Sequence, residues 1–66
     1  MTITKDMLLY EILSTEKADA IATILESEGM HCVGWPSAQM ESLEAACMGH
    51  GIDVNKVVAK INEAIK

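Results

Sequence analysis

The clearest folding signal in this chain of 66 residues is the run DVNKVVAKINEAI at residues 53–65. Its branched apolar residues recur every three or four positions, which is the spacing of one face of an α-helix. Asp53 is suited to cap this helix, because its carboxylate accepts hydrogen bonds from the first free backbone N–H groups. We therefore predict a helix over roughly residues 54–65 whose apolar stripe consists of Val54, Val57, Val58, Ile61 and Ile65.

The rest of the chain contains three more segments with helical spacing of apolar residues, at roughly 7–14, 16–28 and 38–49. No strand-like alternation, internal repeat or long linker separates them. None of these helices is long enough to be stable alone, so each must bury one face against the others. The sequence therefore predicts an all-α fold, a compact array of about four short helices in one domain over residues 1–66.

The second and third of these predicted helices have recognisable ends. Gly29 and Gly51 stand where a glycine in the left-handed conformation ends a helix. On the third helix, Met40, Leu43 and Cys47 share one face, which we predict to point into the core.

Composition and charge exclude several classes of function. Half of the residues are apolar but none is Phe, so the core is aliphatic and the chain is too small to line a large cleft as well. The net charge of −5, with ten acidic residues, five lysines and no arginine, disfavours nucleic acid and anionic membranes as partners. The sequence contains neither a membrane span nor a signal peptide and carries no signal for an oligomeric state. We predict a cytoplasmic protein, in which cysteines are more often thiols or metal ligands than structural disulfides.

The loop GMHCVGWPS at residues 29–37 is the candidate site. Cys32 is its candidate nucleophile, because the amide groups and dipole of the following helix would lower the pKa of a nearby thiol. Pro36 suits the first turn of that helix. His31 either tunes the thiol or faces water. The alternative is that Cys32 is a small residue buried against the core.

The second cysteine allows two further interpretations. Cys47 is either a core thiol or the resolving partner of Cys32, which requires their Cα atoms to lie within about 7 Å. Together with His31 and His50, the two cysteines would make a zinc set, but the usual ligand spacing is absent and we predict no metal. His50 is equally explained by the helix dipole, which favours a protonated ring at a C-terminus.

The remaining loop residues suggest a docking site. Trp35 is either a core residue or, if exposed, an anchor for a protein partner, and Met30 would extend its apolar patch. Gly34 would let a partner's backbone approach, with Pro36 beside it. The sequence has no Ser/His/Asp arrangement, phosphate-binding loop or dinucleotide fingerprint. We therefore predict no cofactor, and an enzyme is not favoured.

Five short motifs together resemble one small bacterial and archaeal family. They are ITKDM at 3–7, EIL at 11–13, GMHCVG at 29–34, ESLE at 41–44 and HGID at 50–53. In order and spacing they are similar to the hybrid-cluster-protein-associated redox disulfide domain, which is also described as a domain of unknown function. The resemblance runs over nearly the entire chain.

This resemblance implies a small multihelical cytoplasmic domain with a Cys-x-Gly-Cys-Pro motif and thiol–disulfide chemistry. Cys32, Val33, Gly34 and Pro36 match the motif, whereas Trp35 stands where the family has its second cysteine. A dithiol cycle needs a second thiol to release the mixed disulfide. Either Cys47 or an external thiol would have to supply it, or the activity has been lost.

Three functions therefore stay open at the level of sequence. The first is a redox thiol module that uses Cys32 and acts on a protein partner. The second is a non-enzymatic interaction or accessory domain that docks through Met30 and Trp35. The third is a metal-binding module that uses the two cysteines and two histidines.

Overall fold

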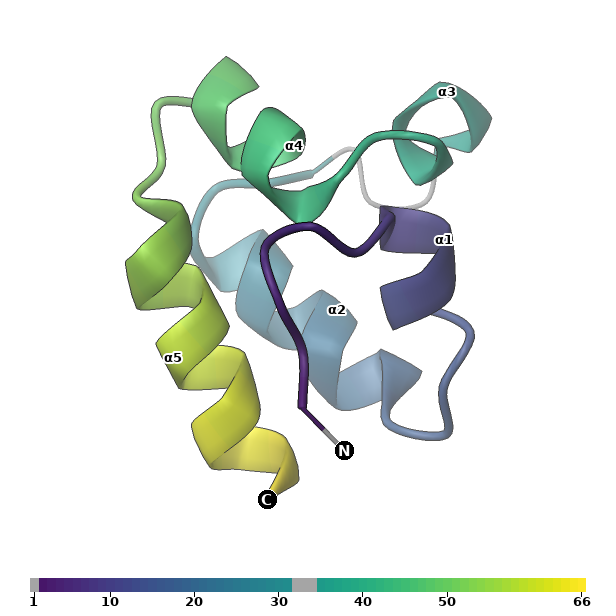
Figure 1. Ribbon diagram of the computed structural model, residues 1–66, viewed down its shortest axis with the longest axis vertical. Coiled ribbons are helices and arrows are strands. Elements are labelled where there is room, and N and C mark those ends of the chain that lie inside the picture. The colour runs from purple at the N-terminus through teal and green to yellow at the C-terminus, as the bar shows by residue number, and fades with distance from the viewer. Residues whose placement is uncertain (1, 32–34) are drawn as a thin grey trace.

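The predicted all-α class is confirmed by the computed structural model of the chain, which describes residues 2–31 and 35–66. Within these residues the chain forms five helices and no strand longer than an isolated bridge. In order they are α1 (Leu9–Ile12), α2 (Ala18–Ser27), α3 (Pro36–Gln39), α4 (Leu43–Gly49) and α5 (Val54–Ile65), as Figure 1 shows.

The two longest helices, α2 and α5, pack against each other and form the main body of the core (Figure 1). Ile21 and Leu25 of α2 and Val57 and Ile61 of α5 are fully buried. Full burial of each such side chain stabilises the fold by about 1.5–3 kcal/mol. The predicted stripe of α5 is thus confirmed at its centre, while Val54 and Val58 are half-buried at its edge.

The N-terminal segment is extended and pairs with the chain that leads into α4. The backbone N–H of Leu43 donates to the carbonyl of Met7 at 2.9 Å, and that of Leu9 donates to the carbonyl of Glu41 at 2.9 Å. The N–H of Glu44 also donates to the carbonyl of Lys5 at 3.0 Å. This pairing, together with a turn in which the N–H of Met7 donates to the carbonyl of Thr4 at 3.3 Å, keeps the residues before α1 out of the helix, so the first helix is shorter than the predicted 7–14.

The side chain of Asn62 fastens this segment to α5. Its Oδ1 accepts a hydrogen bond from the N–H of Ile3 at 2.8 Å, and its Nδ2 donates to the carbonyl of Ile3 at 2.9 Å. The amide thus pairs with both backbone groups of one residue, as a neighbouring strand would. The side chain of Ile3 is buried in the core. The two ends of the chain are therefore joined.

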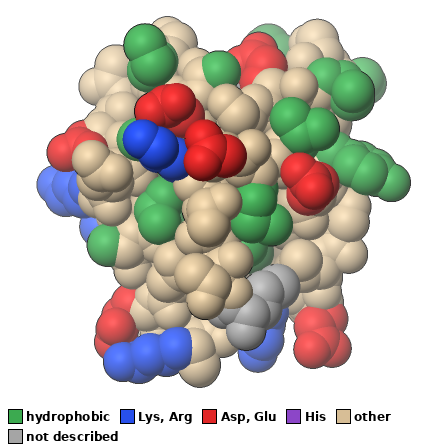
Figure 2. Space-filling view, in the orientation of Figure 1, with side chains coloured by type: hydrophobic (Ala, Val, Ile, Leu, Met, Phe, Trp, Pro, Cys, Tyr) green, Lys and Arg blue, Asp and Glu red, His purple; other side chains and the backbone are tan. Residues whose placement is uncertain are grey.

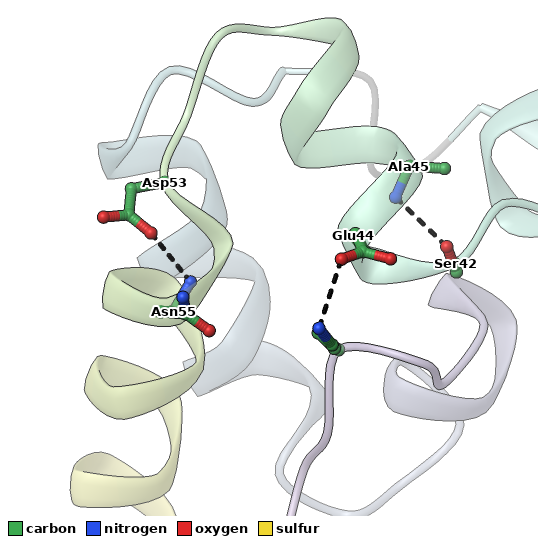
Figure 3. A network of polar contacts seen from close by, with 6 residues as sticks. Ser42, Glu44, Ala45, Asp53 and Asn55 are labelled. Carbon is green, nitrogen blue, oxygen red and sulfur yellow. Dashed lines mark hydrogen bonds and ion pairs between the residues drawn. The ribbon is translucent and has the colours of Figure 1, made fainter.

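The prediction of one continuous helix over 38–49 is wrong in one respect, because the structure divides this segment between α3 and α4. The hydroxyl of Ser42 accepts from the N–H of Ala45 at 3.1 Å and begins α4 (Figure 3). The break leaves Met40 71% exposed at the end of α3, rather than on the inward face that the spacing predicted. Leu43 and Cys47 are buried as predicted. The split accounts for five helices instead of about four.

Two helix ends have the same glycine-centred structure. Gly29 and Gly51 have φ values of +96° and +70°, in the left-handed region that favours glycine. At the end of α2, the N–H of Gly29 donates to Glu26 and that of Met30 donates to Leu25, both at 3.0 Å. This is the Schellman arrangement, and it recurs after α4. The two predicted helix ends are confirmed.

The predicted start of the last helix is also confirmed. The carboxylate of Asp53 accepts from the N–H of Asn55 at 3.0 Å (Figure 3). Such a cap satisfies one of the backbone donors that the first turn leaves free. A further polar contact in this view joins Lys5 to Glu44 at 3.4 Å, where the N-terminal segment crosses α4.

Candidate functional site

Large apolar side chains are exposed at the corner where α1 and α3 meet. Of the described residues, the large hydrophobic ones that are exposed are Tyr10 (59%), Trp35 (62%), Met40 (71%) and Met48 (73%). Tyr10 belongs to α1, whereas Trp35 and Met40 directly precede and follow α3. We call these three residues the corner surface. Met48 belongs to α4 and is not part of it.

The corner surface is held by short helices and backbone hydrogen bonds. α1 packs against α3. The hydrogen bond from the N–H of Leu9 to the carbonyl of Glu41 joins the residue before Tyr10 to the residue after Met40. The carbonyl of Trp35 accepts from the N–H groups of Ala38, at 3.0 Å, and Gln39, at 3.2 Å. Buried Ala38 anchors α3 to the core. The outward side chains therefore stand on a fixed backbone.

The space-filling view shows the chemical character of this corner. In Figure 2, hydrophobic side chains gather over α1 and α3 at the upper right, with acidic side chains beside them. Glu11 and Glu41 are exposed and directly follow Tyr10 and Met40 in the chain. The carboxylate of Glu11 also accepts from the N–H of Leu8 at 2.9 Å, and it thereby caps α1. The corner is thus apolar with an acidic rim.

The structure places part of the sequence-predicted loop site. Cys32 and Gly34 lie outside the described residues, so the predictions made for them stay predictions. His31 is exposed. Trp35 is exposed, which favours the anchor over the core interpretation. Pro36 is the first residue of α3, as its fixed φ predicts.

Met30 corrects one part of the docking prediction, because it is fully buried and cannot belong to an exposed patch. The reason is the Schellman arrangement at the end of α2, in which the residue after the glycine folds back onto the helix. Met30 is held against Leu25 in this way. The signal was present in the sequence as an apolar residue directly after Gly29, and Ile52 after Gly51 repeats it.

Cys47 occupies the core position predicted for it. Its side chain is fully buried, and this burial raises the pKa of the thiol, as do the negative charges of Asp53 and Glu28. A thiol that is buried and protonated is a poor nucleophile and a poor metal ligand. The role of Cys47 as a resolving thiol for Cys32 stays a prediction.

The described members of the predicted zinc set do not come together. No three His, Cys, Asp or Glu side chains in residues 2–31 and 35–66 are placed to hold a metal ion, and this includes His31, Cys47 and His50. Nδ1 of His50 lies 2.9 Å from the carbonyl oxygen of Ala46 at the end of α4. No pocket is found in the described part of the chain either.

Sequence reasoning missed two residues of the corner surface. Tyr10 was not singled out, and Met40 was assigned to the core. The exposed position of Met40 follows from the break before α4, and Ser42 was its signal, since serine before an apolar residue is a common helix start. Nothing in the sequence indicates that α1 and α3 would meet.

The described residues form a small all-α domain in which no pocket is found. Residues 3–58 match the family model of DUF1858, a domain of unknown function, and the chain belongs to this family. It is similar to a protein from Clostridium thermocellum whose solution NMR structure was determined by structural genomics. The two are 45% identical, the match covers 97% of this chain and 89% of the other, and the TM-score is 0.80.

No curated protein gives a significant match to the chain. In the described residues, no helix is both long enough and apolar enough to cross a membrane.

Proposed function

We propose that the chain is a non-enzymatic interaction domain that docks on a protein partner through the corner surface. The observation that carries this proposal is the exposure of Tyr10 on α1 and of Trp35 and Met40 at the two ends of α3, a helix that packs against α1. Tryptophan and tyrosine are the side chains that most often dominate the binding energy of protein interfaces. Met40 adds a flexible apolar side chain that adapts to a partner.

The scaffold beneath these residues supports the same function. A fixed backbone lowers the entropy lost on binding, and aromatic side chains have few rotatable bonds to immobilise. α1 and α3 have four residues each and are fixed by bonds such as that from Leu9 to Glu41. Large apolar side chains exposed on helices that are held in this way are suited to bury area against another protein.

Site-specific photocrosslinking tests the proposal. p-Benzoylphenylalanine is introduced at position 35, at position 40 or, as the matched control, at position 48, where Met48 is equally exposed but lies on α4. We expect positions 35 and 40, but not 48, to form an adduct with the same protein in extracts of the source cells. Excess unmodified chain should compete for this adduct, whereas a Trp35→Ala competitor should not. Equal adducts at all three positions, or no difference between the competitors, would contradict the proposal.

We also propose a second candidate, in which Cys32 forms mixed disulfides with a protein partner in the cytoplasm. Its thiolate would attack a partner disulfide, form one new S–S bond and release one partner thiolate. An external thiol would then resolve the product. The observation that favours an external thiol is the burial of Cys47 and the raised pKa of its thiol. This candidate keeps the thiol–disulfide chemistry of the hybrid-cluster-protein-associated family.

Thiol titration under native conditions tests this second candidate. With Ellman's reagent we expect one fast-reacting thiol in the native chain, none after Cys32→Ser, and a second one only after unfolding, when Cys47 becomes accessible. A Cys32 that reacts no faster than a cysteine in an unstructured peptide would argue against a nucleophilic role.

A further inference from the structure

We infer that the partner of the corner surface is a cationic amphipathic segment of a protein, in which lysine or arginine side chains surround an apolar centre. This inference rests on the docking function proposed above and specifies the chemistry of the partner. It is carried by the distribution of charge around Tyr10, Trp35 and Met40.

The segments that carry the corner surface contain no lysine or arginine. Residues 18–55 contain no lysine or arginine, and neither do residues 6–16. The segments that carry the corner surface therefore supply carboxylates alone as charged side chains, with Glu11 and Glu41 directly beside its apolar residues. The five lysines are Lys5, Lys17, Lys56, Lys60 and Lys66.

Three of these lysines form ion pairs elsewhere, among them Lys66 with Glu63 at 3.1 Å. Lys5 pairs with Glu44, 3.4 Å away (Figure 3), and Lys60 of α5 pairs with Glu28 at the end of α2. In Figure 2, lysine side chains lie on the left side and lower edge, whereas the upper right shows acidic side chains next to hydrophobic ones. The lysines in these ion pairs therefore do not neutralise the acidic rim of the corner.

A cationic partner is the occupant that this rim favours. Charged rims steer association and select partners of opposite charge, while the apolar centre supplies most of the affinity. A second copy of the chain, docked through the same surface by a two-fold axis, would bring the carboxylates of both copies together. An anionic membrane would be repelled for the same reason.

Chemical-shift mapping with two synthetic peptides tests the inference on the full chain. One is an amphipathic helical peptide with leucine on one face and lysine on the other, and its matched control carries glutamate in place of lysine. We expect the lysine peptide to shift the amide signals of residues 9–12, 35 and 37–41, and the glutamate peptide to leave them unchanged. The shifts should weaken as salt is raised, since exposed charges are screened.

Substitutions separate the contribution of the carboxylates to the binding affinity from that of the apolar side chains. Glu11→Gln combined with Glu41→Gln should weaken binding of the lysine peptide by about three- to tenfold, while Gln keeps an acceptor for the N–H of Leu8. Trp35→Ala should weaken it by about tenfold or more. Glu63→Gln on α5 is the matched control and should leave the affinity unchanged.

The outcomes distinguish this inference from the proposed function. Equal binding of both peptides at the corner, or no effect of the double Gln variant, would overturn the cationic partner while the photocrosslinking result still stands. Shifts that avoid α1 and α3 would overturn it as well. So would shifts of the same residues on changing protein concentration without peptide, which would identify a second copy as the occupant.

Discussion

The side of the molecule built by α2 and α5 contrasts with the corner built by α1 and α3. α2 and α5 are ten and twelve residues long and bury fully apolar stripes against each other. α1 and α3 have four residues each and expose Tyr10, Trp35 and Met40. The first side is held by side-chain packing along two long helices. At the corner, only Leu9, Ile12 and Ala38 of α1 and α3 are buried, and backbone hydrogen bonds such as that from Leu9 to Glu41 join the short helices to neighbouring segments.

This difference separates stability from recognition within one small domain. Helices of four residues bury too little area to stabilise themselves, so the packed side of the molecule must hold them in place. The large apolar residues of the corner are then not needed in the core and can be exposed. The two sides should therefore respond differently to mutation.

The largest expected effect is in the core of α5. Ile61→Ala should lower the free energy of unfolding by about 2–5 kcal/mol, because it removes fully buried methylene groups and leaves a cavity. Trp35→Ala should change it by no more than about 0.5 kcal/mol, since exposed residues contribute little to stability. Urea unfolding measures both.

If Ile61→Ala does not fold, Ile61→Val gives a measurable loss of about 0.5–1.5 kcal/mol. A Trp35→Ala variant as unstable as Ile61→Ala would break the comparison, because Trp35 would then belong to the core.

The second expected effect is at the clamp between Asn62 and Ile3. Asn62→Ala removes both hydrogen bonds to the backbone of Ile3 and leaves these part-buried groups unpaired, which should cost about 1–3 kcal/mol. Asn55→Ala, at an exposed position of the same helix, is the matched control. Hydrogen exchange should show faster exchange at Ile3 in the first variant alone. Unchanged exchange there would show that the clamp does not hold the N-terminal segment.

A smaller effect is expected from the pH dependence of Cys47. Burial, together with Asp53 and Glu28, raises the pKa of its thiol in the folded state. As pH rises, the unfolded thiol therefore ionises first, from a pKa of about 8.5. The stability from this group is fully present below that value and is lost as pH rises toward the folded pKa.

Unfolding measured between about pH 7 and about pH 9.5 checks this sign. The stability of the unsubstituted chain should fall toward that of Cys47→Ala as pH rises. Parallel pH profiles would mean that Cys47 has the same pKa in both states.

The smallest expected effect is at the surface pair of α2 and α5. The hydrogen bond from Lys60 lowers the pKa of the Glu28 carboxyl, so this contribution to stability is present above the ordinary carboxyl pKa and is lost as pH falls through the lowered value. Lys60→Met should raise the pKa of Glu28 toward its ordinary value in a carboxyl NMR titration. Lys66→Met, which removes the partner of Glu63, should leave it unchanged. A Glu28 pKa that did not move would show that the pair does not persist in solution.

Part of the candidate site could be predicted from the sequence. Exposure of Trp35 was one of two interpretations that the sequence left open, and the structure bears it out. Burial of Met30 could have been predicted, because an apolar residue after a helix-ending glycine packs back on the helix. Exposure of Met40 could not be inferred from its helical spacing, since the spacing holds only while the helix continues. The helix is interrupted before Ser42, whose hydroxyl begins α4, and at this break the carbonyl of Glu41 accepts from the N–H of Leu9.

The sequence by itself determined the features that depend on neighbouring residues. These are the helix over 54–65 with its Asp53 cap and buried centre, the glycine ends at Gly29 and Gly51, and the all-α class. Only the tertiary structure decided the extended N-terminal segment, the clamp between Ile3 and Asn62 and the meeting of α1 with α3. Those contacts join residues as many as 59 positions apart, and such pairings leave no periodic signal in the chain. The corner surface exists because of them.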